Sequence, residues 1–262
     1  MVINLSPWDV AISAALILVS AGISIALGLK MEKRLAYASI RTVVQLLLVG
    51  FVLQRVFEIN TVIALLPVVL FMLVIAAHTA SGRPAFRFRG MGMLSFSVMT
   101  VTSLGVTITA TGLIIGVEPW FRPSYLIPLL GMVLGNTMNG VSLATDHFLE
   151  SVKEKGHEIE MELALGATRW EAARRPVAEA VRRGMIPIVN SMMVVGVVSL
   201  PGMMTGQILA GSDPTVAVKY QIMVMFLIAA GASMGAMGMV LFSYRKLFNC
   251  RHQLLGSILS RR

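Results

Sequence analysis

The sequence predicts an all-α integral membrane protein with about seven transmembrane helices. Apolar residues make up 56% of the 262-residue chain, and charged residues only 13%. A water-soluble domain of this length needs far more charge to cover its surface. A helix that crosses a bilayer needs about 20 predominantly apolar residues, because lipid offers the backbone no hydrogen-bond partners. Runs of that kind recur along the chain, so we expect a single transmembrane domain over residues 1–262.

Seven runs meet this length requirement. They cover residues 8–29, 36–56, 61–80, 93–117, 124–145, 184–206 and 220–243. The second run carries Arg41, which is close enough to the cytoplasmic end for its long side chain to reach the interface. In the last run Gly231, Gly235 and Gly238 stand four and three residues apart, a spacing that allows another helix to approach closely.

The basic residues predict how the chain is oriented. Of the 22 lysines and arginines, only Arg55, Arg122 and Lys219 fall in one set of alternate loops, and Arg41 lies inside a span. The others fall in the opposite set of loops and in a basic tail at 244–262. Cytoplasmic loops carry the excess of Lys and Arg. We therefore expect the N-terminus outside and the C-terminus in the cytoplasm. The net charge of +9 does not indicate a nucleic-acid-binding protein, because the charges fall in short clusters between apolar runs.

One long hydrophilic segment, residues 146–183, interrupts the apolar runs on the cytoplasmic side. Ser151 with Glu154 and Thr168 with Glu171 have the capping-box spacing that marks a helix start. Gly166 stands where a helix over 152–165 would end in a left-handed residue. Pro176 favours the start of the helix that leads into the sixth span. We predict a helix, a tight turn and a short helix before the chain re-enters the membrane.

Several protein classes lack support in this sequence. There is no GxxxxGK[ST] loop, no HExxH, no CxxC and no serine-nucleophile elbow, so an intrinsic enzyme is not expected. The single cysteine, Cys250, cannot form an internal disulfide and leaves the redox compartment open. The first apolar run lacks a basic n-region and is long enough to span, which argues against a cleavable signal peptide.

The hydrophilic segment contains Glu162, Leu163, Ala164, Leu165, Gly166, Ala167 and Thr168 in succession. This stretch resembles the cytoplasmic loop of ABC-transporter permeases, in which a glutamate and small or apolar residues precede a glycine. The resemblance implies a coupling helix that docks into a groove on a separate ATPase, with Glu162, Leu163, Gly166, Ala167 and Thr168 at the contact. The family's Leu-Pro further along is absent, which argues against an ordinary importer. The alternative is an amphipathic helix that only caps the bundle.

Three other stretches extend the resemblance over nearly the whole chain: VSLPGMMTGQILAGSDP (198–214), GMVLGNTMNGVSL (131–143) and YRKLFNCRHQL (244–254). They are similar to the FetB/YbbM family of permeases, which is associated with iron export and metal resistance and has plant relatives in aluminium tolerance. The resemblance implies a homodimer with two copies of an ATPase that carries the ATP and magnesium. It also implies a multi-pass position in the plasma membrane, or in the inner membrane of a Gram-negative cell.

A substrate path is predicted along the fifth span. Met132, Asn136 and Asn139 stand at i, i+4 and i+7 on one helical face, which Asp146 continues at the cytoplasmic end. Amides in lipid are costly unless paired, so these side chains face substrate, water or protein. Asparagine also ties transmembrane helices together, and the spacing alone does not separate the two roles.

Methionine, with 19 residues, is unusually common. Met192 and Met203 share a face of the sixth run and are further candidates for the path, although methionine also fills irregular gaps between helices. The four histidines are scattered and suggest no metal cage, so the metal ligands stay unknown. Pro201-Gly202 should break or kink the sixth run, either as a gate hinge or as an ordinary helix end.

Together these features favour the permease subunit of an ATP-driven transporter. The family resemblance alone implies that it exports metal ions, with iron as the first candidate. Export of another solute by the same machinery is the nearest alternative. An ATP-independent carrier or channel is a second, although the chain lacks the repeated halves common in secondary carriers. A membrane scaffold that recruits a partner through 146–183 is the third.

Overall fold

The computed structural model describes residues 6–249 and 251–261, so Cys250 lies outside the described part of the chain. Its helices are α1 (Pro7–Ala26), α2 (Glu32–Ile59), α3 (Val62–Gly82), α4 (Met91–Thr109), α5 (Pro123–Glu154), α6 (Gly156–Ala164), α7 (Arg169–Val194), α8 (Gly202–Leu209) and α9 (Pro214–Leu247). A π-helical turn, Ala110–Ile114, extends α4, and a short 3-10 helix, Gly256–Ile258, lies in the tail. Two-residue strands β1 (Phe86–Arg87) and β2 (Ser260–Arg261) pair antiparallel and hold the tail against the loop that follows α3.

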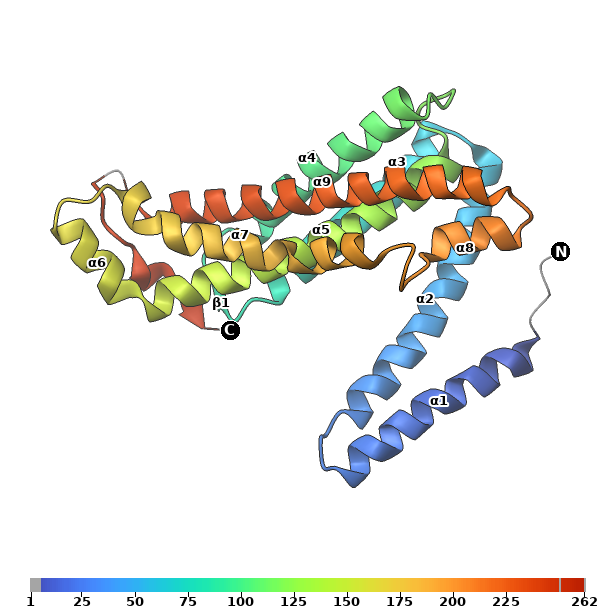
Figure 1. Cartoon of the computed structure of the whole chain (residues 1–262), viewed down its shortest axis with the longest axis horizontal. Coiled ribbons are helices and arrows are strands. Elements are labelled where there is room, and N and C mark those ends of the chain that lie inside the picture. The colour runs from blue at the N-terminus through green and yellow to red at the C-terminus, as the bar shows by residue number, and fades with distance from the viewer. Residues whose placement is uncertain (1–5, 250, 262) are drawn as a thin grey trace.

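Within the described residues, six helices are long and apolar enough to cross a membrane. They are α1, α2, α3, α4 with its π-helical turn, α5 and α9. The predicted run 184–206 is not a continuous helix. Its first part belongs to α7, which begins in the hydrophilic segment, and its last part forms α8. Together α7 and α8 run along the bundle from the end that carries α6 to the end where α9 begins (Figure 1).

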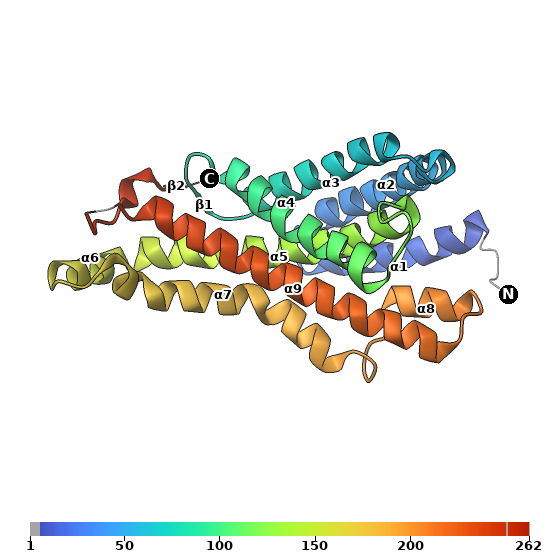
Figure 2. The ribbon, with the colours of Figure 1, turned by 90° about the horizontal axis from the view of Figure 1, so that it is seen from above.

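The centre of the bundle is built from α5, α7 and α9, which lie side by side in both views (Figure 2). Helix α4 packs against α5 and α9, and α3 packs against α4 and α5. The α1–α2 pair diverges from this bundle, and nearly all of its side chains are exposed (Figure 1).

Small residues bring these helices together. The predicted close approach along α9 is confirmed: a Cβ added at Gly231 would lie 2.7 Å from a methyl carbon of Val133. One added at Gly235 would lie 2.5 Å from the methyl carbon of Thr137, and one at Gly238 would lie 3.3 Å from Val98. Contacts this short at Gly231 and Gly235 leave room only for hydrogen, whereas the contact at Gly238 is tight but less strict.

The hydrophilic segment differs from its prediction in two places. The spacing of Ser151 and Glu154 does not mark a helix start, because α5 continues through both residues and ends at Glu154. Pro176 does not begin a helix either: it lies inside α7, two turns after the helix starts at Arg169. Both errors have one cause: local spacing cannot detect that a single helix joins an apolar run to part of the hydrophilic segment, as α5 and α7 do.

The turn between α6 and α7 matches its prediction. Gly166 has φ +97, the left-handed conformation expected of a terminating glycine. The Thr168 capping box is present, with the Thr168 backbone N–H donating to the Glu171 carboxylate at 2.7 Å and the Glu171 N–H donating to the Thr168 hydroxyl at 3.3 Å.

Candidate functional site

Three cavities lie around the interruption between α7 and α8. Helix α7 ends at Val194, and Gly196 follows with φ +82, a conformation that side chains disfavour. The Gly196 N–H donates to the Ser199 carbonyl at 2.9 Å, and Pro201 precedes the first residue of α8. The break predicted at Pro201-Gly202 therefore occurs. However, α7 already ends at Val194, seven residues before the proline, and the chain turns at Gly196. Non-helical backbone at membrane depth is tolerated where it lines a cavity or is buried in protein.

A cavity of about 290 Å³ lies beside this break, between α5, α7, α8 and α9, and is called the central cavity below. Its polar side chains are Asn136, Ser191, Ser199 and Gln221. The rest of its lining is apolar and includes the thioethers of Met132, Met203 and Met225.

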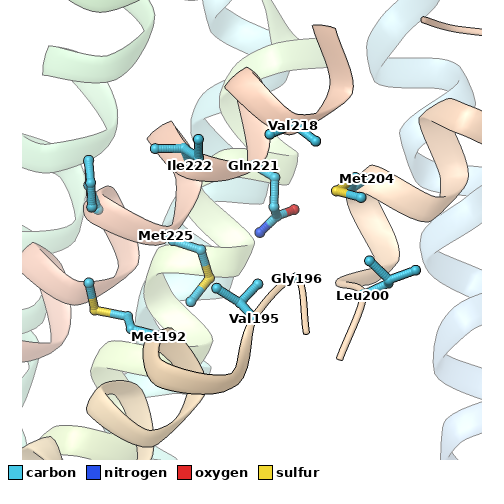
Figure 3. Close-up of a pocket in the computed structure, with 10 residues that line it drawn as sticks. Met192, Val195, Gly196, Leu200, Met204, Val218, Gln221, Ile222 and Met225 are labelled. Carbon is cyan, nitrogen blue, oxygen red and sulfur yellow. The ribbon is translucent and has the colours of Figure 1, made fainter. Parts of the chain in front are cut away.

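A second cavity, of about 430 Å³, opens on the other side of Gln221 and is called the side cavity. It shares Val195, Gln221 and Met225 with the central cavity, so these three residues form the wall between the two. Figure 3 shows the Gln221 side chain extending from α9 into the space near Val195, Leu200 and Met204.

A third cavity, of about 380 Å³, lies among the first turns of α5 and α9 and helix α8. It shares Met132 and Met203 with the central cavity, but Gln221 does not line it. This outer cavity has its own amide, Gln207.

Gln221 is the polar residue that sequence reasoning missed. Its side chain is only 6% exposed, and its Oε1 has no hydrogen-bond partner among the described residues. A buried amide oxygen without a partner is uncommon and calls for an explanation. The signal was present in the sequence, since Gln221 is the one amide in the apolar run 220–243.

Of the four residues predicted to line a substrate path along the fifth span, two line a cavity and two do not. Met132 and Asn136 line the central cavity, and the Asn136 side-chain amide donates to the Met132 carbonyl at 2.9 Å. Asn139 instead accepts a hydrogen bond from the Arg83 guanidinium at 2.6 Å, and Asp146 accepts one from the Ala85 N–H at 2.8 Å. These two side chains fasten the segment after α3 to helix α5.

The two methionines predicted from the sixth run both reach this region, from opposite sides of the break. Met192, near the end of α7, lines the side cavity, and Met203, in α8, lines the central and outer cavities. Among the described residues, no three His, Cys, Asp or Glu side chains lie close enough together to hold a metal ion. In the described part of the chain, the side chains that line the central, side and outer cavities are all uncharged.

The predicted coupling residues form a protruding turn at the far end of the bundle from α8 (Figure 1). The Ala167 N–H donates to the Glu162 carbonyl at 3.0 Å and the Gly166 N–H to the Leu163 carbonyl at 3.1 Å, which closes the end of α6. Leu165 is 81% exposed at the tip of the turn, and a Cβ added at Gly166 would meet no atom within 4 Å. Two hydrogen bonds from Thr168 lower the pKa of Glu171. The larger effect comes from the Thr168 hydroxyl and the smaller from its backbone N–H.

Apolar helices of spanning length, packed around an interrupted helix, define the chain as a multi-pass α-helical membrane protein, which fits the expected location in the plasma membrane. Residues 7–248 match the family described as "Uncharacterised protein family (UPF0014)", and the chain belongs to this family.

Its relatives are bacterial and plant proteins. "UPF0014 membrane protein slr1647" of Synechocystis is 43% identical over 231 residues, which cover 87% of this chain and 88% of that protein. "Probable iron export permease protein FetB" of Escherichia coli is 36% identical over 259 residues, 99% of this chain and 98% of that one. "Protein ALUMINUM SENSITIVE 3" of Arabidopsis thaliana is 30% identical over 250 residues, 95% and 90% of the two chains. No solved structure matches this chain. The resemblance to the FetB/YbbM family expected from the sequence is thereby confirmed.

Proposed function

We propose that this chain is the membrane-spanning permease subunit of an ABC transporter that exports metal ions, iron first among them. Two copies of the chain form a homodimer and work with two copies of a separate ATPase, which binds the ATP and magnesium. Support for the substrate comes from the printed name of the Escherichia coli relative, which aligns over nearly the full length of both chains. Export of another solute by the same machinery is the alternative.

The observation that carries the proposal is the turn between α6 and α7. A coupling element must be rigid, must project from the bundle and must offer an apolar contact to its partner. The α6–α7 turn is closed by backbone hydrogen bonds on one side and by the Thr168 capping box on the other. Leu165 and Met161 expose apolar side chains there, outside the helices that are long enough to span. Exposed apolar residues on a structured cytoplasmic turn fit a protein-docking surface.

The seven-span arrangement belongs to the same proposal. In it, α7 and α8 together make the sixth crossing as an interrupted helix. Interrupted helices line the binding sites of many transporters, because their free backbone groups need a polar or water-filled surrounding. The exposed α1–α2 pair has apolar side chains on nearly every face, which suits contact with lipid and with the second copy of the chain.

The test is ATPase docking to variants of the turn. A side chain at Gly166 disfavours the left-handed backbone by about 1 kcal/mol or more. It meets no neighbouring atom, so the bundle should fold as before. We expect Gly166→Val and Leu165→Asp to reduce co-purification of the ATPase and metal-stimulated ATP hydrolysis in reconstituted vesicles by about tenfold or more, the effect of losing a central interface contact. Glu162→Ala should have a milder effect, because an exposed charge contributes little.

Gly256→Val is the matched control, since this glycine lies in the tail, has no neighbour within 4 Å of an added Cβ and does not have a positive φ. It should retain docking. If Gly166→Val and Leu165→Asp both dock and hydrolyse ATP like the unchanged protein, the coupling assignment is wrong. Transport without any ATPase would instead favour the independent carrier, and partner recruitment without transport would favour the scaffold.

A further inference from the structure

Gln221 lies between the central and the side cavity, and its side-chain oxygen has no hydrogen-bond donor among the described residues. Its Oε1 is buried and has no partner among the described residues, while its side chain lines both the central and the side cavity. Burying an amide oxygen without a hydrogen bond is unfavourable, so a structure that keeps one beside a cavity leaves it available for what enters the cavity.

Two other polar groups of the central cavity share this character. The Asn136 amide already donates to the Met132 carbonyl, which leaves the carbonyl oxygen of its side chain as an acceptor. The Ser191 hydroxyl already donates to the Pro187 carbonyl at 2.9 Å, which leaves its oxygen lone pairs. With Gln221 Oε1, the cavity therefore offers three side-chain oxygens that can accept a hydrogen bond. A ligand that suits them presents hydrogen-bond donors over its surface.

The charge of the lining narrows the ligand further. No Asp, Glu, His, Lys or Arg side chain lines the central or the side cavity in the described part of the chain. A metal cation stripped of its water would have no opposite charge there to offset the large cost of dehydration. A cation that keeps its first shell of water avoids the largest part of this cost, and every water in that shell directs hydrogens outward.

The size of the central cavity agrees with such a ligand. Six water molecules occupy about 180 Å³ at the volume of liquid water, roughly 30 Å³ each. The cavity holds about 290 Å³. Small divalent cations lose water reluctantly and often keep several waters when bound.

We propose that the central cavity binds a metal cation with its hydration shell, and that Gln221 Oε1 accepts a hydrogen bond from a water of that shell. This rests on the proposed transport function and specifies the form in which the cation is held. The thioethers of Met132, Met203 and Met225 form smooth walls around the hydrated ion and do not coordinate it. Since Gln221 also faces the side cavity, the same oxygen guides the ion from one cavity to the other.

The test uses the full chain purified in lipid nanodiscs, without its ATPase. Hexaamminecobalt(III) is the probe, because it is a cation covered in N–H donors that does not exchange its ligands. Its affinity is measured from the rise in thermal unfolding temperature with concentration, and Mn²⁺ is tested as a competitor. Gln221→Leu should weaken binding about tenfold or more, the loss of one hydrogen bond to a charged ligand. Gln221→Glu should tighten it, because the same acceptor then carries a negative charge.

Gln207→Leu is the matched control: it also removes a buried amide oxygen without a partner, but from the outer cavity. It should change the affinity less than about twofold, because Gln207 does not line the central or the side cavity. Unchanged binding in Gln221→Leu overturns the proposal. Two further outcomes do so as well: Ag⁺ binding that Met225→Leu abolishes, which indicates thioether coordination, and spermidine displacing the probe at lower concentration than Mn²⁺, which indicates an organic cation.

The binding measurement and the ATPase-docking test have independent outcomes, so failure of one proposal can be told from failure of the other. A chain that binds the probe but recruits no ATPase retains the hydrated-cation site and loses the coupling assignment. A chain that recruits the ATPase but binds no probe retains the proposed function and loses this site.

Discussion

Single glycines decide how closely the central helices approach. Gly184 of α7 faces Gly140 and Ala144 of α5, and a Cβ added at Gly184 would lie 2.7 Å from both the Ala144 Cβ and the Gly140 carbonyl oxygen. Real carbon atoms do not approach that closely, so the two helices must separate to accept a side chain. Helix packing without a hydrophobic driving force depends on such small residues.

Gly184→Leu should therefore destabilise the α5–α7 contact by about 1–3 kcal/mol, the usual cost of overpacking. The measurement is thermal unfolding of the detergent-solubilised chain. Gly105→Leu in α4 is the control, because a Cβ there meets nothing within 4 Å. It should leave the unfolding temperature unchanged or raise it, since glycine is a poor helix former. Equal stability of the Gly184 and Gly105 variants would contradict the close packing.

Helix α7 joins the α6–α7 turn to the interruption beside the cavities. Its N-terminus is held by the Thr168 capping box and by His252 of the tail, whose Nδ1 accepts the Arg169 N–H at 2.9 Å. At its other end the backbone turns at Gly196 and opens the cavities. Movement of the α6–α7 turn has a continuous helical route to the central cavity, which is what the proposed coupling requires.

The capping box makes the start of α7 sensitive to acid. Because hydrogen bonds from Thr168 lower the pKa of Glu171, the carboxylate contributes stability above its ordinary pKa of 4.5 and loses it as the pH falls through the lowered value. We expect hydrogen-exchange protection of residues 169–173 to fall between about pH 6 and pH 3. The comparison is made in a His252→Ala background, so that the histidine does not contribute.

Thr168→Ala in that background removes the hydroxyl, which is the larger of the two contributions to the lowered pKa of Glu171, and leaves the backbone N–H. It should show weaker protection at neutral pH and a smaller loss in acid. Should the acid-dependent loss have the same size with and without Thr168, the capping box is not its cause.

At the scale of the whole molecule, the two ends of the bundle differ in kind. One end gathers α6, the α3–α4 loop and the tail strand β2, and the other holds α8 and the starts of α5 and α9 (Figures 1 and 2). The basic residues Arg83, Arg87, Arg169 and Arg245 belong to the first end. This separation accords with a cytoplasmic face at the end that carries α6.

Cysteine labelling checks this orientation. In a Cys250→Ser background, a membrane-impermeant thiol reagent applied to intact cells should label Glu118→Cys and Ser212→Cys, which lie at the end with α8. Glu154→Cys, at the end of α5 next to α6, should be labelled only after the cells are opened. Efficient labelling of position 154 in sealed cells would invert the arrangement.

The class of the protein could be predicted from the sequence. Long apolar runs have no stable alternative to helices in a bilayer. The uneven distribution of lysines and arginines predicts an orientation, which the labelling experiment tests. The glycine spacing along α9, the turn at Gly166 and the Thr168 capping box were also predictable, because each depends on neighbours within a few residues.

Which polar residues meet could not be predicted from the sequence, because it depends on how the helices pack. Asn136 and Asn139 share a face of α5, yet one lines the central cavity and the other binds Arg83, because different helices cover successive turns of that face. The position of Gln221 near the start of an apolar run gives no sign of its surroundings. Its amide lies beside two cavities because α7 ends at Val194. Helical periodicity fixes the direction of a side chain from its own axis, whereas its partners depend on where neighbouring helices begin, break and approach.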